Sequence, residues 1–239
     1  MAEIRAPKNA ATVILLRRDG SGGFEVLMTR RAPQMQFLGG HYVFPGGSVK
    51  KEDCSEDLLN RCRGLNGDEA RKIIGSDLTP ELSLGHWVAG IRELFEEAGI
   101  LLCTTETGSP LVMGRRSFME GLAQKRTALI EGSMGFQMLL ESEGLFCDVA
   151  RLVYFSHWLT PVESPTRFDT RFYLALLPAD QRLLPASQEV VHSLWVSPER
   201  ALDLCQQGVL PVIFPTFASL RMLADFDSWE SLTAEYGLV

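Results

Sequence analysis

Residues 87–100 read Trp-Val-Ala-Gly-Ile-Arg-Glu-Leu-Phe-Glu-Glu-Ala-Gly-Ile and predict an amphipathic helix with an acidic face. At about 100° per residue, Glu93, Glu96 and Glu97 share one side of this helix. The opposite side is apolar and is predicted to be buried; it consists of Trp87, Ile91, Leu94, Phe95 and Ala98. Gly99 follows at the position where a left-handed glycine commonly ends a helix.

The three carboxylates on one helix face repel one another, and those in the last turn also oppose the helix dipole. A hard divalent cation would relieve both penalties. Ligands that are all oxygen atoms favour Mg²⁺, Mn²⁺ or Ca²⁺ over softer metals, and Mg²⁺ is commonly shared between carboxylates and substrate phosphates. The alternative interpretation of three glutamates alone is a solvated acidic face.

Length and composition indicate one elaborated globular domain. The chain has 239 residues, of which 46% are hydrophobic and 22% charged, as in ordinary soluble proteins. No apolar run has the roughly 18 residues that a membrane span needs, so we expect no membrane partner. The formal charge of −7 argues against binding to extended nucleic acid.

Cysteine usage and the chain ends suggest the compartment. The five cysteines are odd in number and contain no C-x-x-C pair, so we interpret them as reduced, packed thiols. Residues 1–11 lack an apolar signal segment, and the C-terminal residues are not a Ser-Lys-Leu address. We therefore expect a cytoplasmic protein.

Hydrophobic patterns predict a single domain over residues 1–239, of the α+β class, with a mixed sheet and helices packed on it. Short β-type runs occur at residues 11–16, 24–29, 152–159, 168–177 and 189–196. Helical patterns occur at residues 197–206 and 216–226. Residues 54–86 are polar and indicate an insertion with helical pieces, and residues 115–145 indicate an additional helical region.

Six residues resemble the Nudix box, G-x5-E-x7-R-E-U-x-E-E-x-G-U: Gly47, Arg92, Glu93, Glu96, Glu97 and Gly99. The second half of the box, residues 92–100, matches at every specified position. The first half differs, because Asp53 stands where the family has Glu, and 38 residues separate it from Arg92 where the family has seven. A box split in this way resembles the acyl-CoA diphosphatase subgroup of Nudix hydrolases. The resemblance implies the Nudix fold, a mixed β-sheet sandwiched between helices, with a helical insertion inside the box.

Residues 27–47 resemble the coenzyme A motif of the same subgroup, L-L-T-x-R-S-x3-R-x3-G-x3-F-P-G-G, with its spacing preserved. Three positions differ: Met28 replaces Leu, Ala32 replaces Ser, and Gln36 replaces an Arg whose charge could meet a phosphate. The resemblance implies that the substrate is CoA or acyl-CoA. It also places Arg31, Gly40 and Gly46 at the substrate.

The implied reaction is hydrolysis of the diphosphate linkage of CoA or acyl-CoA, giving 3′,5′-ADP and (acyl-)4′-phosphopantetheine. The implied ligands of Mg²⁺, with Mn²⁺ as a second candidate, are Glu93, Glu96, Glu97 and the carbonyl of Gly47. Glu96 is also counted among the catalytic groups. We expect Arg92 to orient Glu93 or Glu96 through a bidentate pair. Asp53 joins the metal site only if the insertion leaves it near the helix.

The catalytic base is predicted to be Glu189, with Glu163 as the alternative, and either can instead be a solvated loop carboxylate. Arg167 and Arg171 alternate with Asp169 along a predicted strand and so face one side of it. They could bind the 3′-phosphate or the diphosphate of a CoA-like ligand, or form structural ion pairs.

Two other functions remain open on the sequence. One is a Nudix hydrolase of NADH, ADP-ribose or another nucleoside diphosphate derivative. The other is a ligand-binding sensor that kept the fold and lost turnover, against which the intact Arg92–Glu93 and Glu96–Glu97 pairs argue. The expected partner is a small CoA-like nucleotide, and the sequence leaves homodimerisation open.

Overall fold

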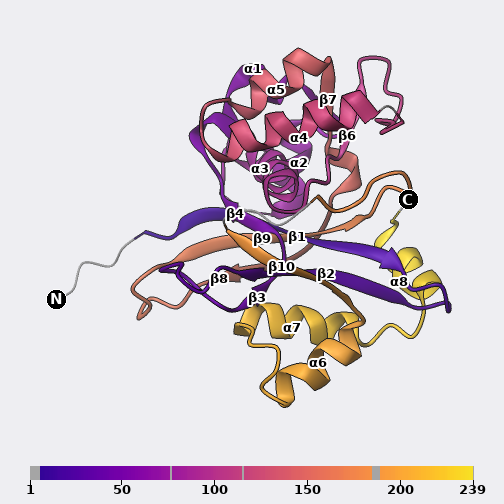
Figure 1. Cartoon of the computed structure of the whole chain (residues 1–239). Helices are drawn as coiled ribbons and strands as arrows, with labels where there is room; N and C mark the ends of the chain where they lie inside the picture. The colour runs from indigo at the N-terminus through magenta and orange to yellow at the C-terminus, as the bar shows by residue number, and fades with distance from the viewer. Residues whose placement is uncertain (1–5, 76, 115, 185–188, 239) are drawn as a thin grey trace.

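The computed structural model describes residues 6–75, 77–114, 116–184 and 189–238. A mixed β-sheet lies between two groups of helices (Figure 1). One group surrounds helix α3 (Pro80–Ala98) above the sheet, and α6 (Pro198–Gln206), α7 (Phe214–Leu223) and α8 (Trp229–Tyr236) cover the other face. The predicted α+β sandwich is confirmed.

The main sheet has the strand order β10-β2-β1-β9-β8, with β3 beside β2 and β4 beside β1. Strands β1 and β9 are parallel, whereas the other pairs are antiparallel. Its strands are β1 (Lys8–Arg18), β2 (Phe24–Arg31), β3 (Tyr42–Val43), β4 (Gly46–Ser48), β8 (Val153–Leu159), β9 (Phe168–Leu176) and β10 (Val190–Val196).

Strand β1 is buried on both sides, which explains its nearly continuous apolar sequence. Val13 and Leu15 belong to a core on the α3 side of the sheet, which we call the upper core. Ile14 and Leu16 belong to a second core beneath the sheet, the lower core, to which α6, α7 and α8 contribute. Period-2 alternation along one strand therefore joins two apolar layers.

Helix α3 begins earlier than residue 87. Thr79 caps it by accepting a hydrogen bond from the Leu82 N–H at 3.2 Å, and Pro80 occupies its first turn. Gly99 ends it in the left-handed region, with φ of +74°. Residues 80–86, which we assigned to the insertion, are thus the first two turns of this helix. Its acidic side is also not solvated, since Glu93 and Glu97 are only 8% and 6% exposed.

The insertion packs around α3 together with the later helical region (Figure 1). It contains a 3₁₀ turn (Lys51–Cys54), α1 (Glu56–Leu59), β5 (Cys62–Arg63) and α2 (Gly67–Ile74). Strand β5 joins β6 (Cys103–Thr105) and β7 (Leu145–Asp148) in a small sheet that the sequence did not predict. The helical region predicted at residues 115–145 contains α4 (Arg116–Ile130) and α5 (Phe136–Glu143). No helix within the described ranges is both long and apolar enough to cross a membrane.

Candidate active site

The carboxylates of α3 face strand β4, where two glycines allow a close approach. The Gly46 N–H donates to Glu97 Oε2 at 3.2 Å. A Cβ added to Gly47 would lie 2.5 Å from Glu93 Oε1, and one added to Gly46 would lie 2.5 Å from the Ala11 carbonyl oxygen. Only bare backbone fits between β1 and the helix carboxylates, which explains why two glycines occur here.

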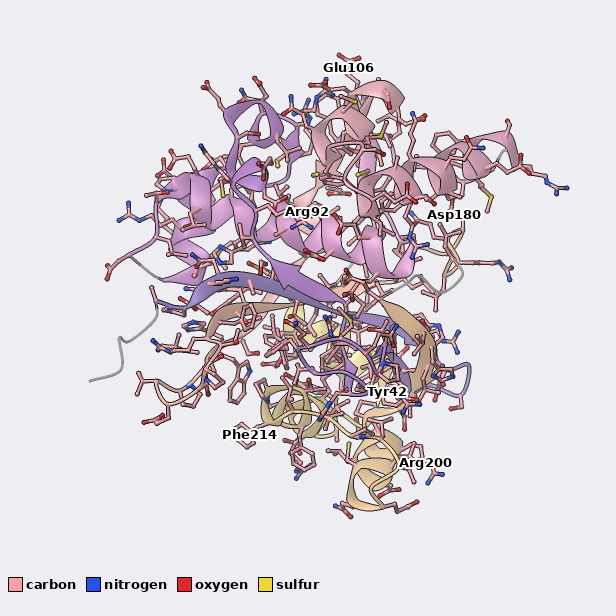
Figure 2. The ribbon with its side chains drawn as sticks, turned by 60° about the vertical axis from the view of Figure 1, so that its left-hand side comes forward. Tyr42, Arg92, Glu106, Asp180, Arg200 and Phe214 are labelled. Atoms are coloured by element: carbon pink, nitrogen blue, oxygen red, sulfur yellow. The ribbon has the colours of Figure 1, made fainter. Side chains whose placement is uncertain are left out.

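Arg92 is the centre of the acidic cluster and is 2% exposed; Figure 2 shows it on α3, on the upper side of the sheet. Its Nε and Nη2 each donate to one oxygen of Asp53 at 2.8 Å. Its Nη1 donates to Glu93 Oε1 at 2.6 Å and to Glu96 Oε1 at 3.1 Å. The expected bidentate pair therefore exists, but its partner is Asp53, while Glu93 and Glu96 each receive a single hydrogen bond.

The neighbours of Arg92 stabilise its positive charge. Burial alone would lower the pKa of this guanidinium, but the hydrogen bond to Asp53 and the charges of Glu93, Asp53 and Glu96 outweigh burial and raise it. Asp53 is itself 1% exposed, and its Oδ2 also accepts from the Lys50 N–H at 2.8 Å. Both of its oxygens thus accept hydrogen bonds, and these contacts place Asp53 beside α3, where it orients Arg92 and the loop.

Glu97 is a buried carboxylate whose pKa is shifted by its surroundings. Burial raises its pKa well above the ordinary value of 4.5, and the charge of Glu93 raises it further, whereas Arg31 lowers it. The Arg31 Nη1 lies 3.8 Å from Glu97 Oε1. Burial likewise raises the pKa of Glu93, with Arg92 opposing the shift. Burial thus disfavours the charged forms of both carboxylates, and a bound cation would favour them.

The donor set suits a hard divalent cation. Across the described ranges, no three acidic, imidazole or thiol side chains already converge as a metal site. The reason is that Glu93 and Glu96 are turned toward Arg92, and Glu97 toward Gly46 and Arg31. Two features suit these residues to a hard cation: the donors on one face of α3 are all oxygen atoms, and Gly47 leaves space beside Glu93. Among the described residues, the ion pairs of Glu93, Glu96, Glu97 and Asp53 are made with Arg92, Lys50 and Arg31, and Arg126 is a further cation near Glu97.

Arg31 and Gly40, both predicted at the substrate, are joined to each other and to this cluster. The Gly40 N–H donates to the Arg31 carbonyl oxygen at 3.1 Å, and Gly40 has a φ of +81°. The Arg31 side chain donates from Nε to the Phe37 carbonyl oxygen at 3.2 Å while its Nη1 faces Glu97. The loop at residues 32–41 is therefore fixed against the acidic end of α3.

Arg126 of α4 is a site residue that sequence reasoning missed. It is 7% exposed, and its Nε donates to the carbonyl oxygens of Phe95 and Glu96 at 3.0 Å, while Nη2 donates to that of Glu97 at 3.2 Å. These carbonyls belong to the last helical turn, and that of Phe95 also accepts from the Gly99 N–H at 2.9 Å. No local motif marks Arg126, because its role depends on α4 packing across the end of α3.

The two candidate bases lie in different surroundings. The backbone carbonyl of Glu189 accepts from the Ala32 N–H at 2.9 Å, and its negative charge contributes to the raised pKa of Glu97. Glu163 is exposed in the connection between β8 and β9, and Glu189 is exposed as well. What distinguishes Glu189 is that its charge acts on Glu97. Residues 185–188, which precede Glu189, lie outside the described residues.

The arginines of β9 lie on the upper side of the sheet and make structural contacts. Arg171 is 2% exposed and pairs through Nη1 with Asp169, which also accepts from His157 Nε2 at 2.5 Å. Two residues further along, Tyr173 packs against Trp87 of α3. Arg167 donates from Nε to the Thr160 carbonyl oxygen at 3.2 Å. Of the two interpretations of Arg171, these contacts show the structural ion pair.

Comparisons with known proteins agree with this geometry. A family model described as the NUDT19 Nudix domain matches residues 68–223. Acyl-coenzyme A diphosphatase NUDT19 of Homo sapiens is 30% identical over 239 residues, covering 88% of this chain and 63% of the human protein. The protein of that name from Gallus gallus is 30% identical over 246 residues, covering 89% and 64%. The chain thus spans less than two thirds of the length of these relatives.

A solved structure, described as a NUDIX hydrolase from Alicyclobacillus acidocaldarius, is similar to nearly the whole chain. Its TM-score is 0.74 at 26% identity, and the match covers 97% of both chains. The similarity therefore extends over the insertion and the additional helices as well as the central sheet.

Proposed function

Because this chain belongs to the Nudix hydrolase family, we propose that it hydrolyses the diphosphate linkage of CoA or acyl-CoA, giving 3′,5′-ADP and (acyl-)4′-phosphopantetheine. One observation carries the proposal: Arg31, from the CoA-like motif, lies 3.8 Å from Glu97, from the Nudix box. Two motifs separated by dozens of residues thus meet at one point. The names of the human and chicken relatives support the same substrate class.

In this proposal the residues of the cluster have different roles in the reaction. Glu93, Glu96, Glu97 and the Gly47 carbonyl would hold Mg²⁺ or Mn²⁺, which supplies neutralisation of diphosphate charge and a more acidic water. Arg92 keeps Glu93 and Glu96 oriented, since its other nitrogens are fixed by Asp53. Glu189 accepts the proton of the attacking water as general base. The leaving phosphate departs with the electrons of the broken P–O bond.

The substrate-binding residues of the proposal are Arg31, Gly40, Gly46, Arg167 and Arg171. Arg31 is the best supported, because its guanidinium is beside Glu97 and can pair with a diphosphate oxygen. The Gly46 N–H donates to the Glu97 carboxylate that Arg31 faces, and the Gly40 N–H donates to the Arg31 carbonyl oxygen. Arg171 would have to exchange Asp169 for a substrate phosphate. A cytoplasmic location remains a prediction from the sequence, and whether the protein forms a homodimer remains open.

Steady-state kinetics on a panel of substrates test the proposal. We expect kcat/KM for CoA and an acyl-CoA to exceed that for NADH and ADP-ribose, with Mg²⁺ or Mn²⁺ supporting turnover and EDTA abolishing it. Preference for NADH or ADP-ribose would keep the Nudix chemistry and reject the CoA assignment. No turnover of any of the four, with tight binding of one, would indicate the sensor instead.

A further inference from the structure

A row of four aromatic side chains lies on the lower side of the sheet. Phe37 packs against Phe168 of β9, with ring centroids 5.1 Å apart, and Trp158 of β8 packs edge-on against Phe214 of α7 at 5.6 Å. Trp158 pairs with Thr170 in the β8–β9 register, so Phe168, two residues earlier on β9, is its diagonal neighbour. We call Phe37, Phe168, Trp158 and Phe214 the aromatic row.

Both ends of the aromatic row are exposed to solvent. Phe37 is 42% exposed and Phe214 is 70% exposed, and Phe214 stands beneath the sheet at the outer edge of its helix (Figure 2). Large exposed aromatic side chains in contact with one another are candidates for a site of interaction.

One end of the aromatic row is tied to the proposed diphosphate site. The Phe37 carbonyl oxygen accepts from Arg31 Nε at 3.2 Å, while Nη1 of the same guanidinium faces Glu97 at 3.8 Å. The next residue, Leu38, has a φ of +55°, a conformation that non-glycine residues seldom adopt and that the surrounding contacts must hold. Arg31 therefore connects the backbone of Phe37 to the carboxylate cluster.

We propose that the aromatic row is the track for the acyl-pantetheine arm of the substrate, an inference that rests on the proposed function. The arm is a long, flexible chain that ends in an apolar thioester. A purine ring would need one or two aromatic partners, whereas four in line suit an extended chain. Since Phe214 lies at the end away from Arg31, it contacts the acyl part, and Phe37 contacts the part next to the diphosphate.

The test is the dependence of KM on acyl-chain length, measured below the micelle concentration for free CoA and a long-chain acyl-CoA. We expect Phe214→Ser to raise the ratio of the long-chain KM to the free-CoA KM by about tenfold, because it removes apolar contact with the chain. Phe214→Leu should restore most of the loss. Met138→Ser, at an exposed methionine of α5, is the matched control and should leave the ratio unchanged. An unchanged ratio in Phe214→Ser would overturn the proposal.

Product inhibition separates the arm from the nucleotide. We expect Phe37→Ser to weaken inhibition by 4′-phosphopantetheine and to leave inhibition by 3′,5′-ADP unchanged. The reverse pattern would show that the row binds adenine and would overturn the proposal. Titration of acyl-CoA in EDTA, followed by Trp fluorescence, gives binding constants without turnover. If binding depends on chain length but no hydrolysis occurs in Mg²⁺, the proposed function is rejected, while the proposal that the aromatic row binds the acyl-pantetheine arm stands.

Discussion

The carboxylate of Asp53 and the guanidinium of Arg92 form a two-bond pair across 39 positions of sequence, with both N–O distances at 2.8 Å. Both side chains are almost fully buried. The pair fixes the start of the insertion against α3 and leaves Nη1 of Arg92 for Glu93 and Glu96. One cation thus sets the positions of three carboxylates, and Asp53 determines the orientation of that cation.

Asp53→Asn should destabilise the protein and reduce kcat together. Removing one charge of a buried ion pair costs about 3–5 kcal/mol, because the other charge stays buried without compensation. Urea unfolding gives the stability and metal-dependent turnover gives kcat. Asp57→Asn, an exposed acid of α1, is the control and should change neither quantity. Full activity of Asp53→Asn would contradict the positioning role.

Glu97→Gln should abolish turnover and, in EDTA, stabilise the protein at neutral pH. Burial raises the pKa of Glu97, so the folded state favours its protonated form. The contribution of Glu97 to the stability of the wild type is therefore fully present below the ordinary pKa of 4.5 and is lost as pH rises through the raised value. Glutamine does not titrate, so unfolding curves over a pH series should separate the two proteins only toward neutral pH. A fully active variant would reject the metal-ligand assignment.

Arg126→Met should loosen the last turn of α3. It removes three charge-assisted hydrogen bonds to the carbonyls of that turn, each of which contributes roughly 1.5–3 kcal/mol. We expect a lower unfolding midpoint and faster amide exchange at residues 95–99. Arg116→Met, whose side chain is 93% exposed, is the comparison and should leave both unaltered. Equal protection in the two variants would show that Arg126 does not stabilise this helix end.

Gly47→Ala should reduce turnover by more than its effect on folding suggests. The added Cβ would lie 2.5 Å from Glu93 Oε1 and would displace this carboxylate. Gly75→Ala is the control: its φ of +62° makes alanine cost about 1 kcal/mol, with no neighbouring atom to displace. The two variants are compared by measuring kcat under conditions in which the same fraction of each protein is folded. Equal kcat values would argue against a tight fit of Gly47 to Glu93.

Glu189→Gln should lower kcat by roughly 10²–10⁴-fold, the range for loss of a general base, with little change in KM. Glu163→Gln should retain activity, since of these two exposed glutamates it is Glu189 whose charge acts on Glu97. If Glu163→Gln were the inactive variant, the assignment of the base would be reversed.

The helix at residues 87–98 and its glycine end were predictable because the information is local. Apolar residues recur at helical spacing, and Gly99 adopts the left-handed conformation that a C-cap requires. The start of the helix was missed, because residues 80–86 follow a polar segment and carry no charge pattern of their own. The insertion appeared in the sequence as an interrupted motif, which says where it lies but not how it folds.

Features that depend on distant contacts could not be read locally. The acidic face of α3 is buried because β4 and the loop from Lys50 to Asp53 pack over it. Strand β5 has two residues, too few for a periodic pattern, and it pairs with β7 more than 80 positions away. Arg126 shows the same limit, since only the packing of α4 reveals the carbonyls that it serves.

The most direct measurement of the central claim is mass-resolved product analysis after hydrolysis of one acyl-CoA with Mg²⁺ in ¹⁸O-labelled water. The account predicts 3′,5′-ADP and the acyl-4′-phosphopantetheine, with one ¹⁸O atom in one of the two phosphates and an intact thioester. Free CoA with a labelled fatty acid, or acyl-CoA left intact, would contradict it.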